Sequence, residues 1–276
     1  GGGTGGSSST IISGTTLKRA ADVVIQRGRD LAAEKLETSP ADIAFRDGTF
    51  EVVGTDRRIG LLELAAYKPF DGDAVFADAA YVIHFGGIGD LVPSIEKPLE
   101  YLSVNAQGTV HMLECARQSA ALRKFVYAAS SSCYGLADTP TTEDHPIRPE
   151  HPYALSKNLG EQASFHWHKV YRMPVNSIRI FNAYGTRSKT SGAYGAVFGV
   201  FLAQKLAGKP FTVVGDGTQT RDFIYATDVA EAFLAAGETE QVGEIWNLGA
   251  GNPQSVNRLI ELLGGPVTHI PKRPGE

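Results

Sequence analysis

A tyrosine and a lysine stand four residues apart in the segment HPYALSK, where a helix is predicted to begin. Residues at this spacing lie one turn apart on the same helix face, so Tyr153 and Lys157 present their side chains together. A run of serines that begins at Ser130 follows the apolar segment KFVYAA. A phenol, an ammonium and a hydroxyl at one place suit proton transfer at a substrate oxygen.

Each of these signals has an ordinary structural explanation when it is taken singly. A tyrosine packed on a lysine stem is common on helix surfaces, and small hydroxyls often end strands and form turns. The position favours chemistry, because Ser130 ends a predicted strand and ligands bind at the carboxyl edge of parallel sheets. Taken together, the three residues indicate a catalytic site.

The elements that must position these residues alternate between short apolar runs and helices from residue 77 onward. Such alternation implies parallel strand pairing and an α/β sheet that is covered on both faces. The expected strands are 80–85, 124–130, 175–181, 211–215 and 244–249, and the expected helices are 105–120, 152–172, 227–237 and 255–264.

The segment before residue 70 has a different pattern. Apolar residues recur near one helical face over 15–37, which predicts an amphipathic helix. The stretch IAFRDGTFEVVG alternates on both sides of Asp47-Gly48, which is the strongest short-range signal for a β-hairpin. Residues 59–67 are expected to form a short helix.

Composition narrows the class of protein. The chain has 276 residues, 42% of them hydrophobic and 20% charged, with a net charge of −4, and this acidic balance gives no reason to expect nucleic acid as a partner. Two cysteines, Cys115 and Cys133, do not make a disulfide framework and suit a reducing cytosol. The longest uncharged run, 190–204, is shorter than the ~18 residues of a membrane span. We expect a cytoplasmic protein without a membrane partner.

The first residues, GGGTGG, satisfy the dinucleotide-binding pattern G-x-G-x-x-G through Gly1, Gly3 and Gly6. That pattern holds a pyrophosphate only where a strand leads into the turn and a helix follows at once. Here no strand precedes the glycines, and SSSTIISG separates them from the predicted helix. We therefore reject the dinucleotide-binding interpretation and expect a flexible segment.

Several motifs in order resemble the extended short-chain dehydrogenase/reductase family, and within it the nucleotide-sugar epimerases and dehydratases. They are YVIHFGG, PLEYLSVNAQGT, YAASSSCYG, PYALSK, IRIFNAYG, VVGDGTQTRDFIYATDVA and WNLGAG. The resemblance covers residues 77–276. It implies an α/β fold, a Rossmann-like doubly wound parallel sheet with a small C-terminal substrate-binding part, and a homodimer for the intact family member.

The resemblance also implies the roles of individual residues. Ser130, Tyr153 and Lys157 would be the catalytic triad, with NAD as cofactor. The implied NAD-binding residues are Gly86, Gly87, Asn105, Ala129, Tyr153, Lys157 and Phe181. The implied substrate-binding residues are Ser131, Ser132, Asn182 and Arg221. Asn182 and Arg221 would contact the diphosphate of a sugar nucleotide, for which an arginine fork is suited. A surface arginine paired with Asp216 or Asp222 is the alternative.

The chemistry implied is oxidation of a sugar alcohol at C4. A phenol with a pKa near 10 is a poor base at pH 7, so we expect the Lys157 ammonium, the nicotinamide charge and the helix N-terminus to lower the pKa of Tyr153. The family's 4,6-dehydratases carry an Asp-Glu pair after the catalytic hydroxyl residue, and its decarboxylases keep the glutamate. Ser131 and Ser132 stand there instead. C4 epimerisation of a UDP-sugar through a 4-keto intermediate is therefore expected, or C4 dehydrogenation or ketoreduction.

Residues 1–68 are similar to a different family, the molybdenum-binding subunit of xanthine and carbon monoxide dehydrogenases. The likeness rests on GTGGSSSTIISGTTLKRAADVV and DIAFRDGTFEVVGTDRRIGLLELAAY. The catalytic glutamate of that family has no counterpart here, so we expect residues 1–70 to be a structural remnant, the helix and hairpin of a molybdopterin-hydroxylase-like fragment.

Residues 77–276 would then be an epimerase/dehydratase-like domain that lacks its first βαβ unit. The join between 68 and 76 fits a natural fusion, an engineered chimera or an assembly artefact. A non-catalytic fragment that binds sugar nucleotides is the alternative to an active enzyme, and we expect NAD to bind the chain as given very weakly at best.

The histidines do not indicate a metal centre. His166 and His168 are two residues apart on a predicted helix and point about 200° apart, so they cannot chelate one ion together. His84 ends a predicted buried strand, where packing or hydrogen bonding is its expected role. Cys133 has no partner that marks it as a nucleophile. We expect no metal site.

Overall fold

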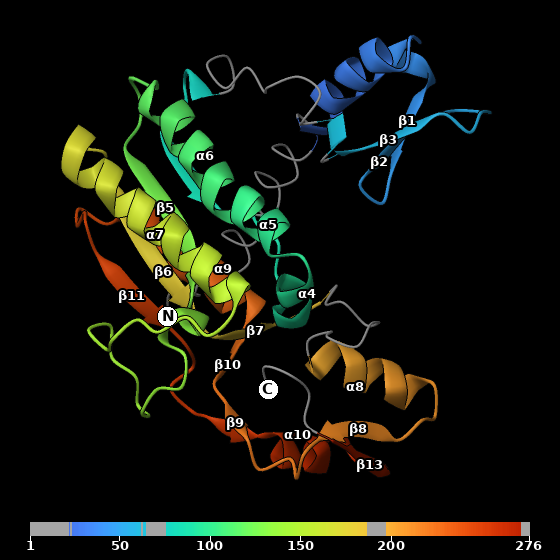
Figure 1. The fold of residues 1–276 in the computed structure, drawn as a ribbon, viewed down its shortest axis with the longest axis vertical. Coiled ribbons are helices and arrows are strands. Elements are labelled where there is room, and N and C mark those ends of the chain that lie inside the picture. The colour runs from blue at the N-terminus through green and yellow to red at the C-terminus, as the bar shows by residue number, and fades with distance from the viewer. Residues whose placement is uncertain (1–21, 23, 62, 65–75, 187–196, 272–276) are drawn as a thin grey trace, which may run out of the picture. The chain divides into compact units, whose positions relative to one another are not determined.

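The structure is a computed structural model, and it describes residues 22, 24–61, 63–64, 76–186 and 197–271. The chain divides into two compact units, Gly1–Asp71 and Gly72–Glu276 (Figure 1). The glycine start and the first residues of the helix expected over 15–37 lie outside the described residues.

The first unit is a helix packed on a three-stranded antiparallel sheet. The helix covers residues 24–35, a short 3-10 turn covers Pro40–Asp42, and the strands are β1 (Ile43–Arg46), β2 (Thr49–Val52) and β3 (Arg58–Gly60) in the order β1-β2-β3. The hairpin at Asp47-Gly48 is confirmed, and both residues have the positive φ that this turn requires, 48° and 78°. The core residues are Ala32, Ala33, Ile43, Phe50, Val52, Ile59 and Leu64.

The helix expected over 59–67 is wrong at its start, because Arg58–Gly60 pairs with β2 as a third strand. Ile59 lies opposite Phe50 in that pairing and is buried with it. Pairing lets the apolar Ile59 join the core, whereas a local helical pattern read from sequence carries no information about a strand partner.

The second unit contains a four-stranded parallel sheet in the order β11-β6-β5-β4 (Figure 1). Its strands are β4 (Tyr81–His84), β5 (Lys124–Ser130), β6 (Val175–Ile180) and β11 (Ile245–Leu248). All seven residues of β5 are buried. A central parallel strand is covered on both faces, which explains why its sequence reads as a continuous apolar run.

Helices cover both faces of this sheet. Successive residues of β5 point to opposite faces, so Phe125 and Tyr127 pack with Leu113 of α6, while Val126 and Ala128 pack with Phe233 of α9. The helices are α4 (Leu91–Glu96), α5 (Pro98–Tyr101), a π-helical stretch (Leu102–Gln107), α6 (Gly108–Arg117), α7 (Pro152–Tyr171) and α9 (Ala226–Glu238). The expected doubly wound α/β sheet is confirmed.

A smaller C-terminal part follows the sheet. The described elements are β7 (Asn182–Tyr184), α8 (Val197–Leu206), β8 (Phe211–Val214), β9 (Thr220–Arg221), β10 (Phe223–Tyr225), β12 (Gln254–Ser255), α10 (Val256–Leu263) and β13 (Val267–Ile270). Three two-stranded sheets form from them, namely β7 with β10, β9 with β12 and β8 with β13. The sequence predicted β8, α9 and α10, but it missed α8 and β13. It also missed the two- and three-residue strands, which are too short to carry a period.

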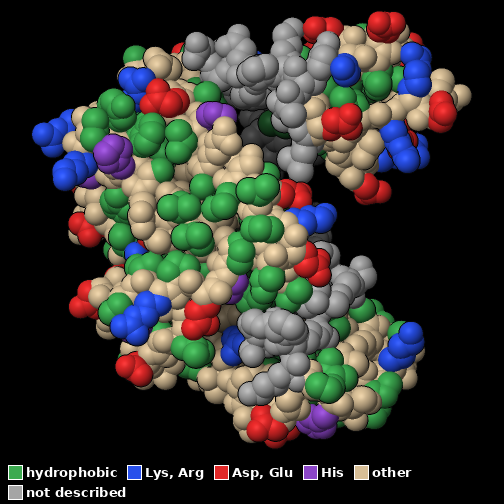
Figure 2. Space-filling model, in the orientation of Figure 1, with side chains coloured by type: hydrophobic (Ala, Val, Ile, Leu, Met, Phe, Trp, Pro, Cys, Tyr) green, Lys and Arg blue, Asp and Glu red, His purple; other side chains and the backbone are tan. Residues whose placement is uncertain are grey.

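The surface of the second unit carries apolar side chains on α7, including Leu155 and Leu159, which are 41% and 36% exposed. Figure 2 shows hydrophobic side chains gathered in the middle of the visible face, with charged side chains mostly around them. Among the described residues, no helix has both the length and the hydropathy that crossing a bilayer requires.

Candidate active site

Ser130 lies where β5 ends and a 3-10 turn, Ser131–Tyr134, begins. Its backbone is extended, and its hydroxyl accepts a hydrogen bond from the Ser132 amide at 3.2 Å and donates to the Ser132 hydroxyl at 3.0 Å. A serine at this cap position satisfies an amide that the short turn leaves without a backbone partner. The result fixes the Ser130 side chain at the carboxyl end of the central strand.

Tyr153 and Lys157 lie in the first two turns of α7. The helix begins at Pro152, which suits a first helical position, and the His151 ring accepts from the Ala154 amide at 3.2 Å. The His151 ring also stacks on the Tyr153 ring, with centroids 6.0 Å apart. This cap and this stack hold the start of α7, and therefore the phenol, in one place.

A pocket of about 150 Å³ opens where β4, β5 and β6 end. Its lining contains Tyr153 and Lys157 of α7. The other lining residues belong to the strand ends and to the loop after β4, namely Phe85, Gly87, Ile88, Gly89, Ala128, Ala129 and Ile180. This is the sheet edge at which doubly wound folds bind ligands.

Burial raises the pKa of the Tyr153 phenol above its ordinary value. The nearby Ser130 hydroxyl acts to lower it, and the Asp90 charge raises it further. The lowering expected from Lys157, the nicotinamide charge and the helix N-terminus together stays a prediction, because in the protein without NAD desolvation disfavours the phenolate more than the nearby groups favour it. Ser130 therefore lies close enough to Tyr153 to affect the pKa of its phenol.

Burial lowers the pKa of the Lys157 ammonium to about 8, while the Glu161 charge acts in the opposite direction. The side chain is 6% exposed, and its Nζ lies 4.5 Å from the centre of the Tyr127 ring. The Tyr127 hydroxyl donates to the Lys157 carbonyl at 3.1 Å. Lys157 is therefore a buried cation at pH 7, held beside the pocket by an aromatic face and the helix backbone.

Asn105 holds the loop that forms one wall of the pocket. Its side chain is fully buried, accepts from the Ile88 amide at 2.7 Å, and donates to the Ile88 carbonyl at 3.0 Å and to Ser156 at 2.9 Å. A Cβ at Gly87 would lie 2.9 Å from the Asn105 side-chain oxygen, so this close approach requires glycine. Gly87 and Ala129 line the pocket, whereas Asn105 acts on its wall.

The pocket fits the nicotinamide end of NAD. Gly87, Gly89, Ala128 and Ala129 leave open space for a flat ring beside Tyr153 and Lys157. The volume of about 150 Å³ is below the roughly 300–1,000 Å³ of sites that enclose a whole drug-sized ligand. These residues would therefore hold one end of a dinucleotide.

The expected substrate residues do not line this pocket. Ser131 and Ser132 are half-buried in the turn after Ser130. The Phe181 amide donates to the Leu248 carbonyl at 2.9 Å, and the Asn182 amide donates to the Asp222 carbonyl at 3.1 Å. Asn182 therefore lies beside the segment that carries Arg221.

Arg221 is exposed, and its guanidinium donates to the Thr220 carbonyl at 2.8 Å. Asp216 and Asp222 are the alternative partners of Arg221. The Asp216 carboxylate accepts from the Thr218 hydroxyl, and the Asp222 carboxylate accepts from the Ala250 and Gly251 amides.

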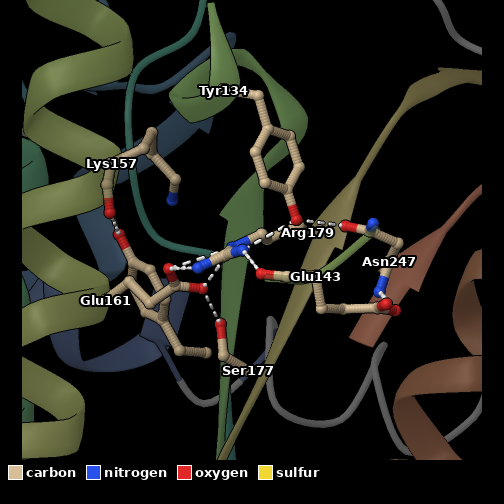
Figure 3. Close-up of polar contacts among 8 residues, drawn as sticks. Tyr134, Glu143, Lys157, Glu161, Ser177, Arg179 and Asn247 are labelled. Carbon is tan, nitrogen blue, oxygen red and sulfur yellow. Dashed lines mark hydrogen bonds and ion pairs between the residues drawn. The ribbon is translucent and has the colours of Figure 1, made fainter. Parts of the chain in front are cut away.

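Sequence reasoning missed a buried ion pair behind the triad, formed by Glu161 of α7 and Arg179 of β6 (Figure 3). Two signals were available. Glu161 continues the four-residue spacing of Tyr153 and Lys157 along one helix face, and Arg179 is a charged residue inside the predicted strand VNSIRI. A charge inside a buried strand needs a partner, and the helix face supplies it.

The other titratable candidates have structural roles. The His84 ring hydrogen-bonds the Thr109 hydroxyl at 3.0 Å, and burial lowers its pKa to about 4, which keeps it neutral. The His168 ring bonds the Met173 carbonyl at 2.6 Å. Burial raises the pKa of the Cys133 thiol to about 11, so it is not a ready nucleophile. In the described part of the chain, no group of three or more His, Cys, Asp or Glu could hold a metal ion.

Residues 41–249 match the sequence model of the NAD dependent epimerase/dehydratase family. The match begins inside the segment that resembles a molybdenum-binding subunit, and that second likeness stays a prediction. A putative UDP-glucose 4-epimerase of Methanocaldococcus jannaschii is 35% identical over 198 residues, which cover 71% of this chain and 64% of that protein. The chain thus spans less than two thirds of that relative's length.

A UDP-glucose 4-epimerase of Mycolicibacterium smegmatis is 33% identical over 237 residues, which cover 85% of this chain and 71% of that protein. Among solved structures, a UDP-glucuronic acid 4-epimerase from Bacillus cereus, in complex with UDP-glucuronic acid and NAD, has a TM-score of 0.70 and 30% identity. That alignment covers 75% of this chain and 68% of the solved chain.

Proposed function

Because the chain belongs to the NAD dependent epimerase/dehydratase family, we propose that it epimerises a UDP-sugar at C4 with NAD as cofactor. One observation carries the proposal: Tyr153 and Lys157 line one pocket at the carboxyl edge of the sheet, where β5 ends at Ser130. The relatives described above bear the names of UDP-sugar 4-epimerases, which supports the substrate class.

The residues divide the work as follows. The Tyr153 phenolate oxygen takes the proton of the sugar C4 hydroxyl, and the Ser130 hydroxyl hydrogen-bonds that sugar oxygen. Bound NAD supplies the acceptor and later the donor of hydride. The buried Lys157 ammonium favours the phenolate, and so does the positive charge of the nicotinamide ring when NAD is bound beside Tyr153. Lowering a phenol pKa by ~3 units requires about 4 kcal/mol of differential stabilisation, which two nearby cations in a partly desolvated site can supply.

The turn after Ser130 favours epimerisation over loss of water. Ser131 and Ser132 offer hydroxyls where an acid and base for dehydration would be carboxylates. The carboxylate of Glu143, which follows in the next loop, accepts from the Asn247 amide at 2.7 Å. A 4-keto sugar formed at Tyr153 therefore meets no carboxylate in this turn, and it turns over and takes hydride back on its other face.

Binding of the nucleotide is assigned to the C-terminal part. Asn182 and Arg221 would hold the diphosphate, because an exposed guanidinium can form two parallel hydrogen bonds with it. The exposed leucines of α7, Leu155 and Leu159, support a homodimer, and the absence of a disulfide framework in the composition supports a cytoplasmic protein. Residues 1–70 are proposed as a molybdopterin-hydroxylase-like fragment, and residues 77–276 as the epimerase/dehydratase-like domain.

The test joins a normal first βαβ unit, taken from a relative, to this chain in place of residues 1–76. The joined protein should bind NAD and interconvert UDP-glucose and UDP-galactose. Release of one equivalent of NADH per sugar would instead identify a C4 dehydrogenase. No turnover with intact UDP-sugar binding would identify a binding fragment and overturn the proposal.

The unaltered chain serves as the comparison. Titration with NADH should show no micromolar binding, since SSSTIISG follows GGGTGG at the point where a pyrophosphate-binding loop leads directly into a helix. Micromolar binding that disappears when residues 1–6 are deleted would restore the dinucleotide-binding interpretation of these glycines.

A further inference from the structure

An ion pair is buried directly behind the candidate active site. Arg179 Nη2 lies 2.7 Å from Glu161 Oε2, and Arg179 Nε donates to the two carboxylate oxygens at 3.1 and 3.2 Å. The two side chains are only 5% and 4% exposed. The Ser177 hydroxyl donates to Glu161 Oε1 at 2.7 Å, so the carboxylate is fully engaged.

The other side of the Arg179 guanidinium reaches the turn that carries Ser130 (Figure 3). Its Nη1 donates to the Tyr134 hydroxyl at 2.7 Å and to the Glu143 carbonyl at 2.9 Å. The Tyr134 hydroxyl in turn donates to the Asn247 side chain of β11 at 2.7 Å. Tyr134 closes the 3-10 turn that Ser130 caps.

One guanidinium therefore joins the two elements that carry the triad. It contacts α7 through Glu161, one turn after Lys157, and it contacts the serine turn through Tyr134. The arginine itself belongs to β6, where it lies opposite Ala129, the neighbour of Ser130. A shift of α7 along the sheet would break the bidentate pair between Glu161 and Arg179.

Packing alone does not explain this arrangement. Burying two charges is costly, and a well-packed apolar pair often holds a helix to a sheet equally well. An apolar pair could not place a negative charge one turn from the Lys157 ammonium, nor donate to the Tyr134 hydroxyl. Glu161 also continues the helix face of Tyr153 and Lys157, so its charge lies on the side of α7 that faces the site.

We propose that Glu161 and Arg179 are positioning residues of the candidate site, which fix α7 against the Ser130 turn and set the electrostatic environment of the Lys157 ammonium. The inference rests on the proposed roles of Ser130, Tyr153 and Lys157. It adds to them two residues that touch neither substrate nor cofactor and that act through their neighbours.

The test follows the Lys157 titration by NMR in the full, ligand-free chain labelled at lysine Cε, with the signal assigned by Lys157→Arg. Glu161→Gln should lower the pKa of Lys157 from about 8 by about one unit, because an opposite charge is lost. Glu114→Gln is the matched control, since it removes the exposed partner of Arg117 and should leave the Lys157 titration unchanged.

A double variant, Glu161→Leu with Arg179→Met, covers the case in which the single variant does not fold. It strands no charge, so it should fold and should still lower the pKa of Lys157. A folded variant of either kind with an unchanged Lys157 titration overturns the inference. The inference is also overturned if the Lys157 pKa falls in Glu161→Gln but returns to its original value in the double variant. The unpaired Arg179 would then be the cause of the shift.

A second signal reports the geometry. The Tyr153 Cζ titration should move to higher pH in both variants, because Ser130, which acts to lower the phenol pKa, would be held less closely to Tyr153. All readouts use the chain without ligand, so they do not depend on whether it turns over a UDP-sugar. Loss of the epimerase proposal and loss of this inference are therefore separate outcomes.

Discussion

The two halves of the candidate site are built in different ways. Tyr153 and Lys157 lie on a 20-residue helix, and Ser130 ends a strand whose seven residues are all buried. Asn182 and Arg221, the proposed diphosphate contacts, lie on strands of three and two residues, and both residues of the shorter strand are exposed.

This difference matches what each half must do. A proton-transfer site needs donors held within a few tenths of an ångström, and buried strands with a capped helix provide that precision. Recognition of a diphosphate relies on a charged fork that can adapt to its ligand, and exposed short strands suit it. Changes in the first half should therefore affect rate and stability, and changes in the second half should affect affinity.

The largest effect is expected from Tyr153→Phe in the joined protein described above. Loss of the general base should lower turnover by about 10² to 10⁴, while UDP-sugar affinity changes little. Steady-state assays with both UDP-hexoses measure it. Tyr171→Phe, at the exposed end of α7, is the control. Full turnover in the Tyr153 variant would remove this residue from the mechanism.

The next effect concerns the buried pair. Arg179→Met leaves Glu161 buried without its partner and should destabilise the second unit by about 3–5 kcal/mol. Urea unfolding followed by tryptophan fluorescence provides the measurement. Arg258→Met removes the exposed Arg258–Glu261 pair on α10 and should cost at most about 1 kcal/mol. Equal effects of the two substitutions would erase the contrast between buried and exposed charge.

A smaller effect is expected in the substrate half. Arg221→Ala should weaken UDP-sugar binding by about 1.5–3 kcal/mol, the range of a hydrogen bond to a charged group, and should leave the unfolding midpoint unchanged. Calorimetry with UDP-glucose separates the two. Arg258→Ala, also exposed but on α10, serves as the control. Unchanged affinity in the Arg221 variant would withdraw the diphosphate assignment.

The smallest effect belongs to the first unit. Gly48 has a φ of +78° in the hairpin, so Gly48→Ala should destabilise this unit by about 1 kcal/mol through backbone strain. Gly60→Ala has open space and no such φ, so it is the matched control. Hydrogen exchange of the β1 and β2 amides reports the change. UDP-sugar binding should not respond, and a response would link the hairpin to the site.

Local signals were sufficient for most elements. The alternating apolar runs predicted β4, β5, β6 and β11 and the helices α6, α7 and α9, but not α4, α5 or α8, and Asp47-Gly48 predicted the hairpin. These elements follow from periodicity and turn chemistry, which act over a few residues. The short strands and β3 did not follow, because a strand of two or three residues exists only through its partner.

In the candidate site, too, the local features could be predicted from the sequence and the features that depend on distant residues could not. The sequence by itself determined that Tyr153 and Lys157 share a helix face and that Ser130 ends a strand, because spacing and strand ends are local properties. Only the tertiary structure decided that Asn105 braces the pocket wall, that burial raises the pKa of Tyr153, and that Glu161 meets Arg179. Burial and partnership depend on residues distant in the chain, and desolvation outweighs the local charges that sequence reasoning could see.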